Sequence, residues 1–399
     1  MTRFIPDVFR DPTIRVSMFA IFAFGFAGAA TSPYQSVVGI RELGLSDIVY
    51  SALIFLAAGV NVVVSVLLGN VADRIGNYRT MLLIVPFFGI VGYGAVYIFP
   101  AQATFVVAIL LFLPIYGALN SLLFANVRAV TRGMPRDDIA NVNSGVRAMI
   151  SLSWVLVPGI TGALLARSAS MLPAYLFASL ACVACLALIA AYLPRQTKAD
   201  APAAPHLSHL AALGAVVSPK VFVRVLAVAL ITSTLHVNAA VLPLITTGAA
   251  NGAVSDIGVL VGIVALLEVI FIVFWGWLQK TMPPLAALTA GTILYVIYLL
   301  LLGFASAPWH LYALTVISGL GAAALISIPI TYLQDLIADR PGLGSSLISI
   351  NIFVSAGLSA LLFALGTAVS SYSGTSIIGA AAGLTGIGML LFFDGRRGR

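Results

Sequence analysis

Apolar stretches of roughly 20 residues recur along this chain of 399 residues, and about twelve of them can be distinguished. An α-helix of that length spans the hydrocarbon core of a bilayer, which is roughly 30 Å thick. Charged residues and Pro/Gly pairs separate the stretches. The pattern therefore predicts an all-α membrane protein that crosses the bilayer about twelve times.

The composition excludes a soluble protein. Apolar residues make up 61% of the chain and charged residues only 8%, whereas soluble domains carry about 25% charged residues. The formal charge of +7 would suggest nucleic acid in a soluble protein, but the 20 Lys and Arg residues lie at the ends of apolar stretches. Topology explains them better, so the expected partner is the lipid bilayer and not nucleic acid.

The apolar runs predict six helices in each half of the chain. Between the halves lies one long polar stretch, residues 194–219, with four prolines and two histidines, which we interpret as a cytoplasmic linker. It joins an N-terminal bundle (1–193) to a C-terminal bundle (220–399). The helices are expected at about 16–38, 47–69, 79–99, 104–126, 143–166, 171–193, 220–246, 256–277, 284–304, 309–333, 343–367 and 374–393.

Alternate loops differ strongly in their number of Lys and Arg residues, and this difference sets the orientation of a protein in the membrane. Seventeen of these residues fall on the side of the N-terminus and only Arg41 and Arg167 on the other, while Arg147 lies inside a predicted helix. Both termini are therefore expected in the cytoplasm, in agreement with an even number of helices.

Neither a metal nor a cofactor is expected. His206 and His209 have a ligand-like spacing but no further ligand nearby, which favours a solvated loop. Cys182 and Cys185 lie in an apolar stretch and are interpreted as small buried side chains. Gly319-Leu320-Gly321 lies inside an apolar span without a preceding strand, so it indicates helix packing rather than nucleotide binding. No phosphate loop is present, and ATP hydrolysis is not expected.

The turn after the second predicted helix carries a specific motif. A glycine is followed four residues later by Asp-Arg, then by a second glycine and a basic residue: Gly69, Asp73, Arg74, Gly76 and Arg79. The pattern resembles the cytoplasmic signature of the major facilitator superfamily and predicts a latch, the alternative being an ordinary charged turn. The chain departs from the signature in one respect, because Asn77 and Tyr78 precede the basic residue. The corresponding turn of the second half, 276–282, lacks the acidic residue.

The fifth predicted helix, from Arg147 through Trp154 and Pro158 to Gly162, resembles that of the sugar efflux transporter family within this superfamily. Val157 and Thr161 stand where a related exporter motif prefers glycine. The resemblance implies two six-helix bundles around a central cavity and export of a sugar or related small polar solute by alternating access. It further implies proton antiport in the plasma membrane, the inner membrane of a bacterium.

Charged groups inside membrane helices are costly and hence functional candidates. Glu268 is the one carboxylate placed deep in a predicted helix, and desolvation there favours its protonated form. Arg147 lies about one turn inside the fifth helix. The superfamily fold would bring these helices together, so an Arg147–Glu268 pair is the predicted proton-coupled gate. His236 is the rival proton site, and a static role for Glu268 stays open.

Solute hydroxyls bind amides and hydroxyls, and sugar rings pack on aromatic faces. Each candidate can instead join two helices. The candidates in the predicted spans are Tyr34, Gln35, Asn61, Asn120, Trp154, His236, Asn238 and Asn351. Pro33, Pro158, Pro243 and Pro329 are expected to break or kink their helices.

Two rival functions remain. A multidrug or other metabolite exporter would share the same fold. A membrane-embedded enzyme or receptor would need a nucleophile with a base, metal ligands or a sizeable soluble domain, and no such pattern is present. We therefore expect a transporter and not an enzyme.

Overall fold

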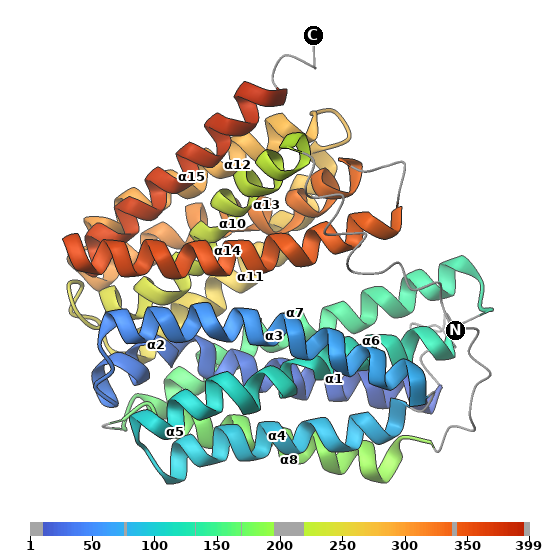
Figure 1. Cartoon of the computed structure of the whole chain (residues 1–399). Coiled ribbons are helices and arrows are strands. Elements are labelled where there is room, and N and C mark those ends of the chain that lie inside the picture. Colours follow the sequence, from blue (N-terminus) through green and yellow to red (C-terminus); the bar gives the residue numbers. More distant parts are fainter. Residues whose placement is uncertain are drawn as a thin grey trace, which may run out of the picture. The chain divides into compact units, whose positions relative to one another are not determined.

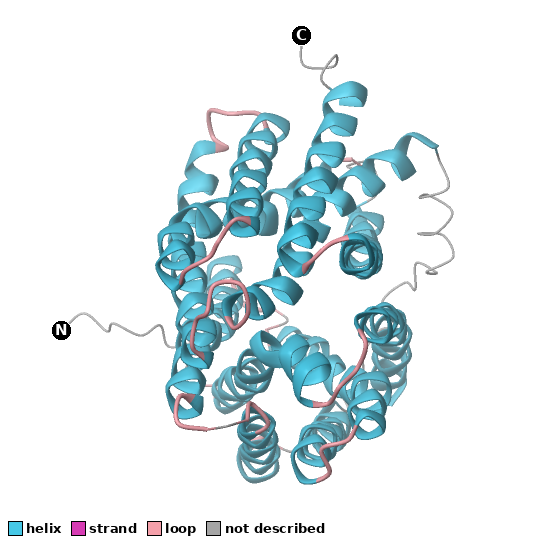
Figure 2. Cartoon of the chain, turned by 90° about the vertical axis from the view of Figure 1, so that its left-hand side faces the viewer, coloured by secondary structure: helices cyan, strands magenta, loops and turns pink. Residues whose placement is uncertain are grey.

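The computed structural model describes residues 11–75, 78–131, 133–168, 170–194, 219–336 and 341–394. Every regular element in these ranges is helical (Figure 2). Twelve of the helices are long and apolar enough to cross a membrane. The predicted all-α, twelve-span fold is therefore confirmed. The linker 195–218, with His206 and His209, lies outside the described residues.

Contacts between residues divide the chain into two compact units (Figure 1). Unit 1 consists of residues 1–44 and 59–204, and unit 2 of residues 45–58 and 205–399. The predicted boundaries at 193 and 220 fall at or beside the undescribed linker and stay a prediction.

The first span of unit 1 is interrupted. Helix α1 (Pro12–Thr31) gives way to a 3₁₀ turn (Ser32–Tyr34), then to α2 (Gln35–Val37) and a π-helical turn (Val38–Glu42). Pro33 lacks a backbone N–H for the α-helical pattern, which explains why α1 ends at Thr31, as predicted. The fourth span likewise runs through α5 (Gln102–Val107), a π-helical turn (Ala108–Phe112) and α6 (Leu113–Val130).

The other spans of unit 1 are continuous helices. Asp137 and Asp138 occupy the first turn of the fifth span, where carboxylates stabilise the positive end of a helix. That span therefore begins seven residues earlier than the expected 143, and Arg147 lies about three turns inside it rather than one. The bounds are α3 (Asp47–Ile75), α4 (Tyr78–Ile98), α7 (Arg136–Leu165) and α8 (Pro173–Tyr192).

Unit 2 contains six continuous helices, several of which begin at a proline, a residue favoured at the first helical position. Pro243 and Pro329 lie inside helices that continue through them. The bounds are α10 (Pro219–Thr246), α11 (Val254–Leu278), α12 (Pro284–Gly303), α13 (Pro308–Asp335), α14 (Pro341–Val369) and α15 (Tyr372–Asp394), close to the expected ranges.

The first half of α3, residues 45–58, belongs to unit 2. Tyr372 donates a hydrogen bond to Asp47 at 2.9 Å, and the Ser51 hydroxyl donates to the carbonyl of Ala360. Tyr50 packs edge-on against Phe363. Polar and aromatic contacts thus hold this segment on α14 and α15, and α3 belongs to both units.

Glycines allow close helix packing in unit 2, as the sequence predicts. A Cβ at Gly321 of α13 would lie 2.9 Å from the backbone nitrogen of Tyr295 in α12. A Cβ at Gly386 of α15 would lie 2.6 Å from the carbonyl oxygen of Ala227 in α10. Only a residue without a side chain permits these approaches. The interpretation of Gly319-Leu320-Gly321 as a packing motif is confirmed.

Candidate functional site

The latch motif spans the end of α3 and the start of α4. Gly69, Asp73 and Arg74 lie on the last turns of α3, which runs to Ile75 rather than ending at 69. Their side chains, and Gly76 itself, lie outside the described part of the chain. Arg79 is described: its Nε donates to the carbonyl of Leu193 at 3.0 Å and its Nη2 to that of Ala190 at 3.1 Å.

These two carbonyls lie at the C-terminal end of α8, where helix carbonyls lack intrahelical donors. A guanidinium there satisfies them and complements the negative end of the helix dipole. Arg79 therefore joins the start of α4 to the end of α8 within unit 1. The latch role of the whole motif stays a prediction.

Glu268 lies in the middle of α11, half-buried in unit 2. Every other carboxylate in the described helices lies within about two turns of a helix end. Tyr295 of α12, which is 2% exposed, lies within electrostatic range of Glu268. The structure thus places the predicted proton-carrying group at mid-helix, within electrostatic range of a buried hydroxyl.

A network of neutral side chains surrounds that hydroxyl. Tyr298 donates a hydrogen bond to Asn238 Oδ1 at 2.8 Å. Tyr295 also interacts with the Asn238 side chain, and Tyr298 with Ser318 of α13. The carboxamide of Asn238 therefore joins α10 to α12, the interhelical role that the sequence left open beside substrate binding. Neither tyrosine was a candidate, because sequence alone does not distinguish a networked tyrosine from one packed in a core.

The other candidates in unit 2 differ in exposure. His236 is exposed on α10, whereas Asn351 of α14 is 5% exposed and donates to Thr232 Oγ1 at 3.2 Å. Arg147 is exposed on α7 of unit 1. Because Arg147 and Glu268 belong to different units, their pairing stays a prediction.

In unit 1 the aromatic candidates support the interrupted first span. Tyr34 is fully buried and its hydroxyl donates to the carbonyl of Pro158 in α7 at 3.5 Å. Trp154 is half-buried against a small apolar cluster that includes Ala30 and Val157. Gln35 is half-buried. The side chain of Tyr34 therefore joins two helices, as the alternative interpretation allowed.

The amide candidates of unit 1 lie on neighbouring helices. Asn61 of α3 is exposed, and a Cβ at Gly117 of α6 would lie 3.0 Å from its Oδ1. Asn120 lies one turn further along α6, and its buried Oδ1 has no hydrogen-bond partner. Cys182 and Cys185 are both buried and free, which confirms their interpretation as small core side chains.

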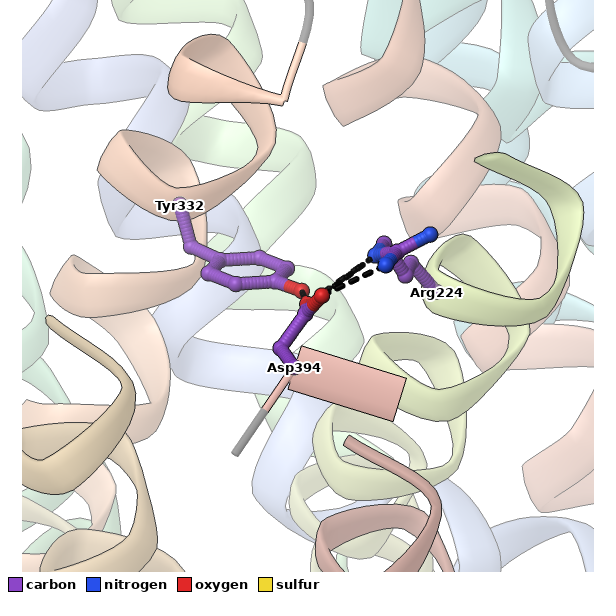
Figure 3. Close-up of polar contacts among 3 residues, drawn as sticks. All are labelled: Arg224, Tyr332 and Asp394. Carbon is purple, nitrogen blue, oxygen red and sulfur yellow. Dashed lines mark hydrogen bonds and ion pairs between the residues drawn. The ribbon is translucent and has the colours of Figure 1, made fainter. Parts of the chain in front are cut away.

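An ion-pair cluster in unit 2 was missed by the sequence analysis (Figure 3). Arg224 of α10 donates from Nε to both carboxylate oxygens of Asp394 at 2.9 Å and from Nη2 to Oδ1 at 2.5 Å. The Tyr332 hydroxyl of α13 donates to Oδ2 at 2.5 Å. Arg224 was counted only as an orientation signal, because nothing in the sequence pairs it with a residue 170 positions away.

Comparison with known proteins identifies the family. The Major Facilitator Superfamily profile matches residues 17–247, more than half of the chain. The chain therefore belongs to this superfamily: it is a multi-pass membrane transporter and not an enzyme.

Three relatives illustrate the match. A protein of Deinococcus radiodurans named "Putative sugar efflux transporter" is 27% identical over 378 residues, which cover 94% of this chain and 96% of that protein. The crystal structure of the nucleoside transporter NupG matches with a TM-score of 0.81 at 11% identity, over 96% of this chain and 99% of that one. The peptide transporter POT in complex with sulfate matches with a TM-score of 0.78 at 16% identity, over 96% and 94%. The two structural matches support the fold alone.

Proposed function

We propose that this transporter exports a sugar or a related small polar solute in exchange for protons, by alternating access. The substrate class is supported by the name of the relative that matches nearly end to end. The neutral character of the polar groups in the spans, mainly amides and hydroxyls, agrees with an uncharged ligand. The proposed solute-binding residues are the eight candidates predicted from the sequence: Tyr34, Gln35, Asn61, Asn120, Trp154, His236, Asn238 and Asn351.

The proposed proton carrier is Glu268. The observation that supports this role is its mid-helix position, because a carboxylate far from both helix ends is costly in a membrane and is therefore a functional candidate. Arg147 is the proposed gate partner when Glu268 is charged. His236, exposed on α10, is the alternative proton site.

The test is solute flux driven by a pH gradient in proteoliposomes. Glu268→Gln cannot release a proton, so it is expected to lose uphill export while it keeps solute binding and solute exchange. His236→Gln, measured in parallel, is expected to retain coupling. Full coupling in Glu268→Gln together with none in His236→Gln would move the proton site to His236.

Replacing Arg147 tests the gate separately. If closure of the gate buries Glu268, loss of its partner costs up to a few kcal/mol, so Arg147→Gln is expected to change the solute affinity measured from the cytoplasmic side. An unchanged affinity on that side would argue against the pair.

The proposed orientation places both termini and the linker 194–219 in the cytoplasm of a cell with a bacterial inner membrane. Its basis is the unequal distribution of Lys and Arg. Reporters that are active only in the cytoplasm, fused after Arg399 and within the linker, are both expected to be active. Activity of a periplasmic reporter at either position would contradict this orientation.

The latch motif is proposed to act on the transport cycle rather than on binding. Asp73→Asn is expected to slow flux in vesicles at equal protein level and to leave solute affinity unchanged. Normal flux would show that the motif has no latch role in this chain.

A further inference from the structure

Helices α10 and α14 of unit 2 meet along a seam of neutral polar side chains. Thr232 of α10 and Asn351, Ser355 and Ser359 of α14 are all buried. The Thr232 hydroxyl donates to the carbonyl of Val228 at 3.0 Å, so its oxygen is left to accept from Asn351 Nδ2 at 3.2 Å. This pair of bonds determines the amide orientation, with the carbonyl oxygen of Asn351 directed away from Thr232.

That carbonyl oxygen, Asn351 Oδ1, is buried and has no hydrogen-bond partner in the structure. A buried acceptor without a donor destabilises a protein, because it has lost its hydrogen bonds to water. Asn126 of unit 1 is also buried, and its Nδ2 donates to Ser17 Oγ at 3.2 Å. Neither of these two side chains has a buried polar atom without a hydrogen-bond partner. The free acceptor is therefore a feature of Asn351 and not of every buried asparagine.

An exposed residue lies beyond one end of the seam. His236 lies one turn beyond Thr232 on α10 and is exposed. Ser355 lies one turn beyond Asn351 on α14. The two helices are the seventh and eleventh spans, which cross the membrane in the same direction, so His236 and Ser355 are expected at the same level. The free acceptor therefore lies about one helical turn along the seam from the exposed imidazole.

The chemistry of the seam selects the ligand. Neither α10 nor α14 contains an acidic residue, so a cation finds no countercharge on these helices. An unpartnered carbonyl oxygen repels an anion and requires a donor. Resting on the proposed function, we propose that Asn351 Oδ1 accepts a hydrogen bond from one hydroxyl of a neutral polyhydroxyl solute, with His236 at the entrance and Thr232 as the residue that positions the amide.

The experiment uses the purified full chain and measures ligand affinity from thermal shifts, because a bound ligand stabilises the folded state by mass action. The probes are glucose, arabinose and lactose, the monodeoxy derivatives of glucose, uridine, a dipeptide and tetraphenylphosphonium. The variants are Asn351→Leu and Thr232→Val, with Asn126→Leu as the matched control for loss of a buried amide in unit 1.

At least one sugar is expected to stabilise the wild type. Asn351→Leu is expected to bind that sugar about tenfold more weakly, Thr232→Val to show a smaller loss, and Asn126→Leu to bind it normally. One monodeoxy sugar should bind the wild type about tenfold more weakly and lose nothing further in Asn351→Leu. This pattern assigns a single solute hydroxyl to Asn351. Because the deoxy series on the wild type needs no variant, it can still overturn the subsite if Asn351→Leu does not fold.

The possible failures are distinguishable. Equal sugar affinity in the wild type and Asn351→Leu, or equal affinity of the wild type for every deoxy sugar, would overturn the subsite and leave the proposed function standing. An equal loss in Asn126→Leu would also overturn it. Stabilisation of the wild type by tetraphenylphosphonium or the dipeptide but by no sugar would overturn the proposed function itself, and the subsite with it.

Discussion

Equivalent spans of the two units differ in the regularity of their helices. The first and fourth spans of unit 1 are each interrupted by a π-helical turn, whereas the first and fourth spans of unit 2, α10 and α13, are continuous helices. π-Helical turns occur often at functional sites, because they shift side chains and free backbone carbonyls. The backbone irregularity among the described spans is therefore concentrated in unit 1.

Unpartnered polar side chains are concentrated in the same unit. Three of the four buried polar atoms without a hydrogen-bond partner in the described chain belong to unit 1: Ser36 Oγ, Tyr116 Oη and Asn120 Oδ1. Unit 2 contributes only Asn351 Oδ1, while its tyrosines, Asn238 and the Arg224 cluster bond to one another. Unit 2 thus contains an ion-pair cluster and a tyrosine–asparagine network, whereas most of the unpartnered buried polar atoms among the described residues lie in unit 1.

Breaking the ion-pair cluster of unit 2 is expected to have the largest effect on stability. Arg224 and Asp394 have side chains only 7% and 14% exposed, and Arg224→Met leaves the carboxylate without its guanidinium. Removing one partner of a buried pair costs about 3–5 kcal/mol. Denaturant unfolding of the purified protein should show this loss.

The matched control is Arg79→Met in unit 1. Arg79 binds two helix-terminal carbonyls instead of a carboxylate, and water can replace it there, so the expected loss is about 1–2 kcal/mol. The double variant Arg224→Met/Asp394→Leu should recover much of the stability lost in the single variant. Equal losses for Arg224→Met and Arg79→Met would refute the contrast between the units.

A smaller effect is expected from Tyr298→Phe in the neutral network of unit 2. The variant removes the hydrogen bond to Asn238 and leaves that half-buried acceptor with fewer partners. The expected destabilisation is about 1–2 kcal/mol, measured by the same unfolding assay. If Tyr298→Phe is neutral, the network does not hold α10 and α12 together.

The smallest effect is expected from Tyr116→Phe in unit 1. The Tyr116 hydroxyl is buried and has no hydrogen-bond partner among the described residues; the Cys182 thiol, a weak hydrogen-bonding group, lies near it. Removing an unsatisfied hydroxyl costs little and can stabilise, so the free energy of unfolding should change by less than about 0.5 kcal/mol or rise. A loss as large as that of Tyr298→Phe would show that Tyr116 has a partner, such as a bound water.

Much of the fold could be predicted, because helix length and apolar composition depend on the bilayer and not on contacts within the protein. The ranges expected for α10 to α15 differ from the observed bounds by only a few residues. The errors lie where local chemistry extends a helix past its apolar run. Asp137 and Asp138 lengthened α7 at its start, and α3 continues through the Asp73-Arg74 pair.

The candidate site was predictable in part. Glu268 stood out because a lone carboxylate in a long apolar run is conspicuous in any sequence. Tyr295, Tyr298 and Thr232 did not, because hydroxyl-bearing residues are common in membrane helices, and the partners of Tyr298 and Thr232 lie 60 and 119 positions away. A separation of 170 positions likewise concealed the bond between Arg224 and Asp394.

The sequence alone determined that the chain is a membrane protein with about twelve spans, because the length and spacing of its apolar runs depend on the bilayer and not on contacts between helices. Only the tertiary structure decided which polar residues are engaged and which are free. Asn238 and Asn351 look alike in sequence, yet Asn238 Oδ1 accepts from Tyr298 and Asn351 Oδ1 has no donor. Whether a buried acceptor meets a donor depends on the packing of distant helices, which no local pattern records.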